Sequence, residues 1–349
     1  MTTTPVLRRP GFRVRVLAVL LAGCAALAAC GAPQQSADGR QQITYLNVLP
    51  MESLSFAAEM VAETKGFFAA HGLDVKFQST QGSAPAIQTV LAGSALVTRI
   101  GDIETMIAAG QRNAPVTAFG ELIHKNTIRM ISTEAAPIRR AADFRGKLVG
   151  TPSEGGTSSI TLDMVVGSAK VPPAEVRRQV VGLSPGVFDL LTAGRVDAYI
   201  VSLDTAMLLD RTRPEAVVYD PNEAVAAGAQ VYVTSTRQAA DPAAQDKLKR
   251  FMAAIDDAAK FIIADEQKGF AETIALISGK YKVAALADPE TARAGLAAYV
   301  AAYRSNDSLV GISAQRWAAT YSEIVGVGQL PPGLDPARWV NPSFAPASP

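Results

Sequence analysis

Residues 54–77, LSFAAEMVAETKGFFAAHGLDVKF, decide the fold that the sequence predicts. Apolar side chains recur at helical spacing over residues 54–70, and Gly66 and then Gly72 are expected to close the helix. From Leu73 to Phe77 apolar and charged residues then alternate, which is typical of a strand with one buried face. A helix that passes directly into a strand is a unit from which α/β folds are built.

The same alternation extends in both directions from this segment. Strands are expected at 43–49, 95–100, 116–119, 127–132, 147–150, 179–181, 196–201, 216–219 and 230–234, and helices at 85–92, 103–109, 158–166, 187–193 and 205–209. Beyond residue 239 the pattern is helical, with an apolar stripe over 248–261 and helices at 289–303 and 313–325, the last capped by Ser313. A Pro-rich tail from Pro331 is expected to wrap or fray. Strands alternating with helices of this length predict an α/β fold with mainly parallel sheets.

Length and composition limit the classes of protein to consider. A chain of 349 residues exceeds one ordinary domain, which predicts two lobes. The formal net charge of +1 gives no reason to expect nucleic acid as a partner. The two histidines, His71 and His124, are far apart in the sequence, and both cysteines lie before residue 31. A zinc site, a Cys/His nucleophile or a body disulfide is therefore not expected, and neither is a cofactor.

The first thirty residues have the order of a secretory signal peptide, with a basic start, an apolar run over 16–29 and small residues. They end in Leu27-Ala28-Ala29-Cys30, which resembles the bacterial lipobox, whose cysteine is lipidated and becomes the first mature residue. The apolar run is too short to span a bilayer, which takes about 20 residues. We expect a lipoprotein signal peptide at 1–30, a flexible tether at 31–42 and an extracytoplasmic protein anchored to the membrane through lipid on Cys30. Two alternatives stay open: lipidation of Cys24, and cleavage without lipidation.

Three motifs in order carry a resemblance to a known family. Lys65-Gly66-Phe67-Phe68 precedes His71-Gly72-Leu73-Asp74-Val75, and Asp143-Phe144-Arg145-Gly146-Lys147-Leu148-Val149-Gly150 and Ala193-Gly194-Arg195-Val196-Asp197-Ala198 follow. They are similar to elements of the NMT1/THI5-like group of ABC-importer solute-binding proteins, which includes nitrate, sulfonate, taurine and thiamine-pyrimidine binding proteins. The resemblance implies a two-lobed periplasmic-binding-protein-like α/β fold (type II) with mixed, mainly parallel sheets and flanking helices. Lobe 1 is expected at 43–134 and 237–349, and lobe 2 at 135–236.

The resemblance also implies a function. A protein of this group captures a small molecule between its lobes and delivers it to an ABC import permease, so the expected partners are a permease and an ATPase subunit. We expect a monomer that is not an enzyme. Two alternatives are an enzyme of pyrimidine synthesis on the same scaffold, which needs a histidine-rich site, and a ligand-sensing module.

Candidate ligand contacts follow from the topology, since open α/β sheets bind ligands at the carboxyl ends of their strands. The richest such segment is the glycine and hydroxyl loop 151–159, where the backbone can approach a ligand and the next helix offers free N–H groups. An ordinary capped loop is the alternative reading. The predicted ligand-binding residues are Met51, Glu52, Asp102, Ser153, Gly155, Gly156, Thr157, Ser158, Ser184 and Asp204.

The charges at these strand ends bear on the ligand. Glu52, Asp102, Glu154 and Asp204 are all acidic, and no arginine stands out beside them. Carboxylates that face the cleft would repel a strong anion and accept hydrogen bonds from a nitrogen heterocycle. The expected ligand is therefore pyrimidine-like, with a small organic anion such as a sulfonate as the other possibility. Each carboxylate is equally well explained as a helix cap or a solvated side chain.

Overall fold

The structure is a computed structural model that describes residues 1–2 and 38–346. All but the first two residues of the predicted signal peptide, most of the tether and both candidate lipidation sites lie outside these residues. The described strands are β1 (Gln41–Asn47), β2 (Leu73–Ser79), β3 (Val97–Gly101), β4 (Val116–Ile123), β5 (Ile128–Thr133), β6 (Leu148–Thr151), β7 (Arg177–Val180), β8 (Ala198–Ser202), β9 (Ala216–Tyr219) and β10 (Gln230–Ser235).

Helices alternate with these strands up to β10 and then dominate the chain. The described α-helices are α2 (Ala57–Thr64), α3 (Phe67–Ala70), α4 (Ser83–Ala92), α5 (Asp102–Arg112), α6 (Thr157–Ser168), α7 (Phe188–Thr192), α8 (Leu203–Thr212), α9 (Thr236–Ala240), α10 (Pro242–Asp265), α11 (Ala271–Ser278), α12 (Pro289–Tyr303) and α13 (Ala314–Gly326). Short 3-10 helices include η1 (Leu54–Phe56), η4 (Pro185–Val187), η7 (Ala284–Ala287), η8 (Pro336–Trp339) and η9 (Pro342–Phe344). No helix of the described residues is long and apolar enough to cross a membrane.

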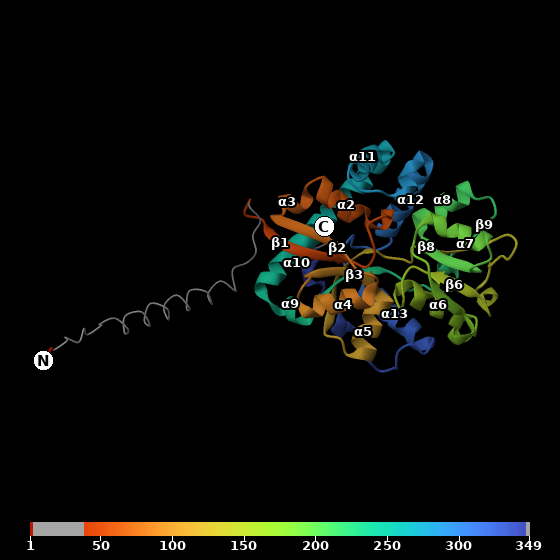
Figure 1. Cartoon of the computed structure of the whole chain (residues 1–349), viewed down its shortest axis with the longest axis horizontal. Helices are drawn as coiled ribbons and strands as arrows, with labels where there is room; N and C mark the ends of the chain where they lie inside the picture. Colours follow the sequence, from red (N-terminus) through yellow and green to blue (C-terminus); the bar gives the residue numbers. More distant parts are fainter. Residues whose placement is uncertain (3–37, 347–349) are drawn as a thin grey trace.

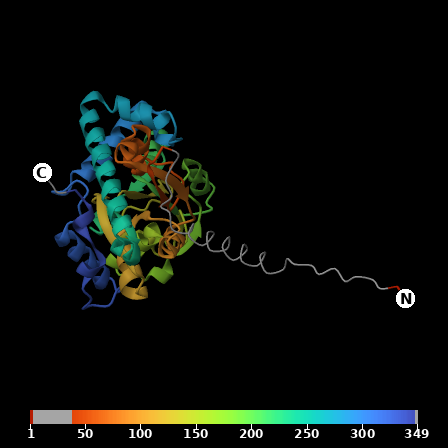
Figure 2. The same ribbon diagram turned by 90° about the vertical axis from the view of Figure 1, so that its left-hand side faces the viewer.

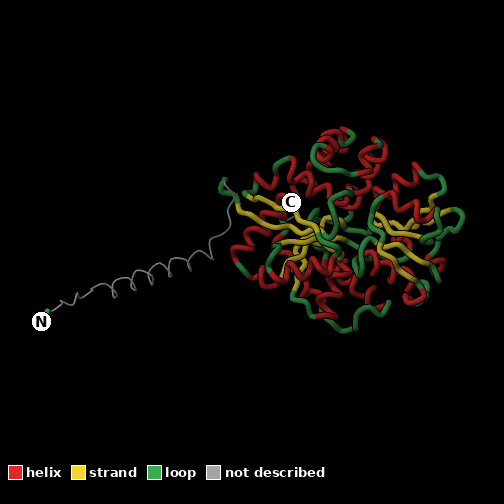
Figure 3. The backbone as a smooth tube through the Cα atoms, in the orientation of Figure 1, coloured by secondary structure: helices red, strands yellow, loops and turns green. Residues whose placement is uncertain are grey.

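Two five-stranded sheets lie side by side along the long axis of the molecule, as Figures 1 and 3 show. The strand orders are β2-β1-β3-β10-β4 in the first sheet and β7-β6-β8-β5-β9 in the second. We call the parts packed around them lobe 1 and lobe 2. In each sheet two strand pairings are parallel and two are antiparallel, because β10 and β5 run against their neighbours. The expected strand and helix alternation is therefore present, but the sheets are more evenly mixed than the sequence suggested.

Two strands cross over between the lobes, and the boundaries expected from the sequence are wrong for both. They placed β5 in lobe 1 and β10 in lobe 2, whereas β5 pairs with β8 and β9, and β10 pairs with β3 and β4. The chain therefore passes between the lobes at 124–127 and again at 220–229. The local pattern identifies a strand but not the sheet that accepts it, because pairing is a long-range choice.

The helix expected over 54–70 breaks at Gly66, the first of the two glycines expected to close it. It begins as η1 and ends at Gly66, where a φ of +87° interrupts the helix before α3. Glycine adopts this left-handed conformation without the steric cost that a Cβ brings. The break lets Phe68 stack on Phe251 of α10, which runs along the outside of lobe 1 (Figure 2).

The C-terminal segment holds lobe 1 together from outside. Trp317 of α13 is buried and donates its indole N–H to the carbonyl of Pro336, and the tail then pairs with β4 through Asn341 N and Ala118 O at 2.8 Å. Phe344, near the end of the described chain, is buried against Phe119. The Pro-rich tail therefore wraps the exposed edge of the first sheet, which protects that edge from other pairing.

The predicted cap of α13 is confirmed, because the Ser313 side chain accepts a hydrogen bond from Arg316 N. Replacing Ser313 with alanine leaves this N–H unpaired and is expected to lower the free energy of unfolding by about 1 kcal/mol. Urea denaturation measures the change. The control is Ser322→Ala on the same helix, where an exposed hydroxyl is lost and a change below about 0.5 kcal/mol is expected. Equal losses in the two variants would contradict the capping role.

Candidate functional site

Two adjoining cavities open between the lobes at the carboxyl ends of β1, β6 and β8. The inner chamber has a cavity volume of about 100 Å³ and the outer chamber about 740 Å³. They share the wall residues Leu49, Ser53, Pro152, Leu183 and Ser202, so the two chambers adjoin, and we call them together the cleft. The location agrees with the rule that α/β sheets bind ligands at strand carboxyl ends.

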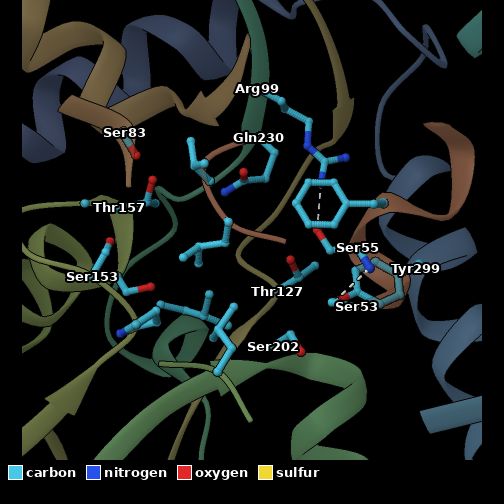
Figure 4. Close-up of a pocket in the computed structure, with 18 residues that line it drawn as sticks. Ser53, Ser55, Ser83, Arg99, Thr127, Ser153, Thr157, Ser202, Gln230 and Tyr299 are labelled. Atoms are coloured by element: carbon cyan, nitrogen blue, oxygen red, sulfur yellow. Dashed lines mark hydrogen bonds between the residues drawn. The ribbon is translucent and has the colours of Figure 1, made fainter. Parts of the chain in front are cut away.

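The inner chamber has a polar wall on each side, with each side drawn from a different set of elements. Figure 4 shows Ser83, Ser153 and Thr157 on one side and Ser53, Ser55, Arg99 and Tyr299 on the other, with Gln230, Thr127 and Ser202 between them. Leu49, Phe56, Ile128 and Leu183 add apolar surface. A small cavity lined by hydroxyl, amide and apolar groups suits a small molecule that has both polar and apolar surface.

Arg99 is the charged residue of the inner wall, and it was not among the residues predicted from the sequence. It sits on β3 with its side chain almost fully buried, and its guanidinium pairs with Glu59 at 3.0 Å. Burial disfavours the charge, but Glu59 outweighs this and raises the pKa of Arg99, so the side chain stays cationic. Because Glu59 neutralises it, the inner wall carries no net charge from this pair. The apolar setting of Arg99 in Val97-Thr98-Arg99-Ile100 was the signal available in the sequence.

A hydroxyl network holds Glu59 in place beneath the chamber. Glu59 is fully buried and accepts hydrogen bonds from Tyr45 at 3.1 Å and Tyr232 at 2.8 Å. Burial and the Glu59 charge raise the pKa of both tyrosines, so both remain hydrogen-bond donors. Arg99 is thus fixed by groups that themselves lie outside the chamber.

The glycine and hydroxyl loop lies in the chamber wall as the sequence led us to expect, and it also joins the lobes. Ser153, Gly156, Thr157 and Ser158 line the inner chamber, at the N-terminus of α6. The Thr157 hydroxyl accepts from Gly101 N at 3.1 Å and donates to Glu104 Oε2, which are both in lobe 1. Burial raises the pKa of Glu104. Thr157 therefore couples this loop of lobe 2 to lobe 1.

Asp204 forms a second contact between the lobes rather than a part of the pocket wall. Its buried carboxylate, at the start of α8, accepts hydrogen bonds from Ser53 Oγ at 2.8 Å, Leu54 N at 3.1 Å and Tyr299 Oη at 3.1 Å. All three donors lie in lobe 1, and Ser53 and Tyr299 line the inner chamber. Asp204 is therefore placed to hold two wall residues and to close the lobes.

The remaining predicted residues fall in different places. Glu52 and Ser184 line the outer chamber, and Met51 lies with Glu52 beside a shallower hollow next to it. Gly155 is exposed and lines neither chamber. Glu154, from the charge argument, is also exposed and lines neither chamber.

Asp102 lines neither chamber, because its carboxylate is used inside the protein. It accepts hydrogen bonds from Ile103 N at 2.7 Å, from Gly228 N at 3.2 Å and from the Thr320 hydroxyl at 3.2 Å. Gly228 belongs to the second crossover between the lobes, so Asp102 anchors that crossover to α5 and α13. The premise of four acidic side chains facing the cleft with no arginine is therefore wrong.

The anchoring by Asp102 predicts a pH dependence of stability. Burial, with a contribution from nearby Glu121, raises the pKa of Asp102 to about 7 from an ordinary value of 3.8. The folded protein then holds a proton that the unfolded chain releases, so the free energy of unfolding falls as pH rises from about 4 to about 7. Asp102→Asn removes this contribution. In urea titrations, stability of the variant relative to the native chain is expected to rise over that range and level off above it, and a constant difference would contradict the assignment.

Both histidines are engaged away from the cleft. The His71 ring, at the C-terminal end of α3, lies 2.7 Å from Asp257. Buried His124 contacts Glu121 at 2.9 Å and the carbonyl of Leu309. Neither lines the inner or the outer chamber. Among the described residues, no group of three or more His, Cys, Asp or Glu side chains is arranged to hold a metal ion.

Comparison with known proteins places this chain in a family. Residues 53–268 match the family model described as NMT1/THI5 like, which spans more than half of the chain. The chain belongs to the NMT1/THI5-like family. The resemblance read from the three sequence motifs is thereby confirmed. A curated relative is the riboflavin-binding protein RibY of Chloroflexus aurantiacus, 25% identical over 219 residues. The match covers 62% of this chain and 56% of that protein.

Solved structures support the fold. A protein from Bordetella bronchiseptica RB50 superposes with a TM-score of 0.69 at 20% identity, covering 87% of this chain and 95% of that one. The alkanesulfonate-binding protein SsuA of Xanthomonas axonopodis pv. citri, solved with bound MOPS, gives 0.63 at 15% identity, covering 88% and 99%. The expected periplasmic-binding-protein-like α/β fold is confirmed, while identities this low carry the fold alone.

Proposed function

We propose that this protein is an extracytoplasmic solute-binding component of an ABC importer that captures a neutral nitrogen heterocycle between its lobes. The observation that carries the proposal is the cleft itself, whose inner chamber combines hydroxyl, amide and apolar groups from both lobes. A ligand seated there touches both lobes at once, so it stabilises the closed form by its differential affinity.

The crossovers suggest how the lobes move. We place lobe 1 at 38–125 and 228–346 and lobe 2 at 126–227, so that two segments, near 126 and near 227, act as hinges. Asn126 and Ala227 meet there, with Asn126 Nδ2 donating to Ala227 O at 3.5 Å. Domain closure about a few such residues is a common response to ligand binding.

Charge balance favours a neutral ligand. Arg99 is paired with Glu59, and no carboxylate lines the inner chamber, so the inner wall neither attracts nor repels a full charge strongly. The riboflavin-binding relative supports a heterocycle of this kind. A small organic anion such as a sulfonate is the second candidate, because the N-terminus of α6, which has no side-chain cap, opens into the chamber.

Delivery of a ligand to an importer requires partner proteins and a position at the membrane. We expect a permease and an ATPase encoded beside this chain, a monomeric binding protein, and a lipid anchor on Cys30. Cys30→Ser is expected to abolish labelling with a palmitate analogue and membrane retention. If labelling persists, Cys24 is the lipidated residue.

An enzyme on the same scaffold is disfavoured by the positions of the histidines. His71 and His124 are held in ion-pair or hydrogen-bond contacts outside the cleft, so neither is available as a general base in the inner chamber. A binding role needs no such group.

A ligand screen by thermal unfolding tests the proposal. Riboflavin, a 4-aminopyrimidine, taurine and nitrate are compared with the purified full chain. A bound ligand at a hundred times its dissociation constant stabilises the fold by about 2.7 kcal/mol, which raises Tm by several degrees. We expect the rise from a neutral heterocycle. We also expect the shift to disappear in the combined variant Thr157→Ala, Ser158→Ala and Asp204→Ala, and a shift that persists there would contradict the assignment of the cleft.

A further inference from the structure

A buried hydrogen-bond donor on Arg99, a residue that lines the inner chamber, has no partner among the described residues. Arg99 donates through one terminal nitrogen to Ser55 at 2.8 Å and pairs through the other with Glu59, but its Nε–H meets no acceptor among the described residues. No other residue lining the inner chamber has a side-chain polar atom that is buried and unpaired within the described chain. Leaving a buried donor unpaired is unfavourable, and an incoming acceptor removes that cost.

The direction of this donor is fixed. Glu59 and Ser55 hold the two terminal nitrogens, and the guanidinium lies over the Phe56 ring at 4.5 Å. The planar group is therefore held on two of its edges and on one face, so that its position is set before a ligand arrives. Preorganised donors lose little conformational entropy on binding, which increases their contribution to affinity.

Gln230 lies beside Arg99 on the neighbouring strand. In the antiparallel register of β10 and β3, Gln230 is opposite Gly101 and Tyr232 is opposite Arg99. Arg99 and Gln230 are therefore diagonal neighbours on one face of the sheet, a spacing that long side chains bridge readily. Figure 4 shows the Gln230 amide extending into the space between Arg99 and Thr157.

The two side chains offer complementary hydrogen-bonding groups. Arg99 Nε is a donor only, whereas the Gln230 amide has both an acceptor oxygen and a donor nitrogen. A ring edge with a carbonyl oxygen next to an N–H satisfies both, with the carbonyl facing Arg99 and the N–H facing the Gln230 oxygen. A sulfonate or nitrate group has only acceptor oxygens, so it offers no N–H next to its oxygen for the Gln230 oxygen to accept.

We infer that Arg99 and Gln230 recognise the carbonyl and N–H edge of a cyclic amide or imide. This inference rests on the proposed function and narrows its ligand class to heterocycles that carry such an edge. The rest of the molecule then extends into the outer chamber, which is far larger than the inner one. Recognition through an N–H group rejects analogues that lack it, because the protein's own polar groups are then left unpaired.

A methylated ligand tests the assignment. Lumiflavin carries the imide N–H and 3-methyllumiflavin does not, while the two rings are otherwise the same. Fluorescence titration of the full chain is expected to show at least tenfold weaker binding of the methylated compound, since one lost hydrogen bond in a closed site corresponds to about 1.4 kcal/mol or more.

A substitution of Gln230 tests whether its side chain recognises the N–H group of the ligand. Gln230→Leu is expected to weaken lumiflavin about tenfold and to remove the preference over 3-methyllumiflavin. Gln88→Leu, which changes an exposed residue of α4 that lines neither chamber, is the matched control and should keep the preference. Arg99 is not substituted, because its removal leaves Glu59 as a buried charge without an ion-pair partner.

The possible failures are distinguishable. Equal affinity for the two compounds, or a preference that survives in Gln230→Leu, overturns the inference that Arg99 and Gln230 recognise this edge of the ligand. The proposed binding function is unaffected by either result. If the native chain binds taurine or nitrate and neither flavin, the proposed ligand class fails, and the assignment fails with it.

Discussion

Replacing Asp204 with alanine is expected to weaken ligand binding at least tenfold while the chain stays folded. The carboxylate of Asp204 is the acceptor for three buried donors of lobe 1, on Ser53, Leu54 and Tyr299. Leaving such groups unpaired costs about 1–3 kcal/mol each, and the protein avoids that cost by opening the lobes so that water reaches them. The loss therefore falls on the closed, ligand-binding form.

Titration with the heterocycle that raises Tm in the ligand screen measures the affinity, and small-angle scattering measures the closure of the lobes. The variant is expected to have weaker binding and a larger radius of gyration at saturating ligand. Asp210→Ala, an exposed carboxylate on the same helix, is the control and should leave both unchanged. An Asp204→Ala protein with native affinity and native dimensions would show that the contact contributes nothing to closure.

Replacing Glu59 with alanine is expected to destabilise the folded chain strongly. It removes the partner of buried Arg99 and the acceptor of the Tyr45 and Tyr232 hydroxyls. Breaking a buried ion pair by removing one partner costs about 3–5 kcal/mol, because an uncompensated charge remains in the interior.

Urea denaturation of the ligand-free chain measures this loss. Glu63→Ala on the same helix is the matched control, since Glu63 is half-buried and pairs with Lys280 near the surface, where about 1 kcal/mol or less is expected. Similar losses in the two variants would contradict the view that removing Glu59 leaves Arg99 as an uncompensated buried charge. Native stability in Glu59→Ala would contradict it as well.

The local elements of this fold follow closely from the sequence. The helix expected at 289–303 is α12 with the same bounds, and Ser313 caps α13, because both depend on nearest-neighbour patterns and side-chain chemistry. The placement of β5 and β10 does not follow, since a strand can pair with a segment more than a hundred residues away, as β10 does with β3. The break at Gly66 was visible as a glycine, but its left-handed φ depends on how α3 packs against α10.

The site residues also fall into two groups, those that local sequence predicts and those that depend on contacts between distant segments. The loop from Ser153 to Ser158 was predictable, because glycine and hydroxyl residues before a helix have a local meaning. Arg99 and Gln230 were not, since each is one polar residue in an apolar strand, and the face it occupies depends on sheet pairing. Asp102 and Asp204 were assigned to a ligand because they follow strands, whereas backbone N–H groups and hydroxyls of distant segments satisfy both carboxylates.

Calorimetric titration of the full chain with riboflavin and with taurine tests the central claim most directly. We predict saturable binding of the neutral heterocycle at one site per chain, no binding of the sulfonate, and loss of the heat signal in Asp204→Ala. Saturable binding of taurine with no heat from any neutral heterocycle would contradict the proposed function.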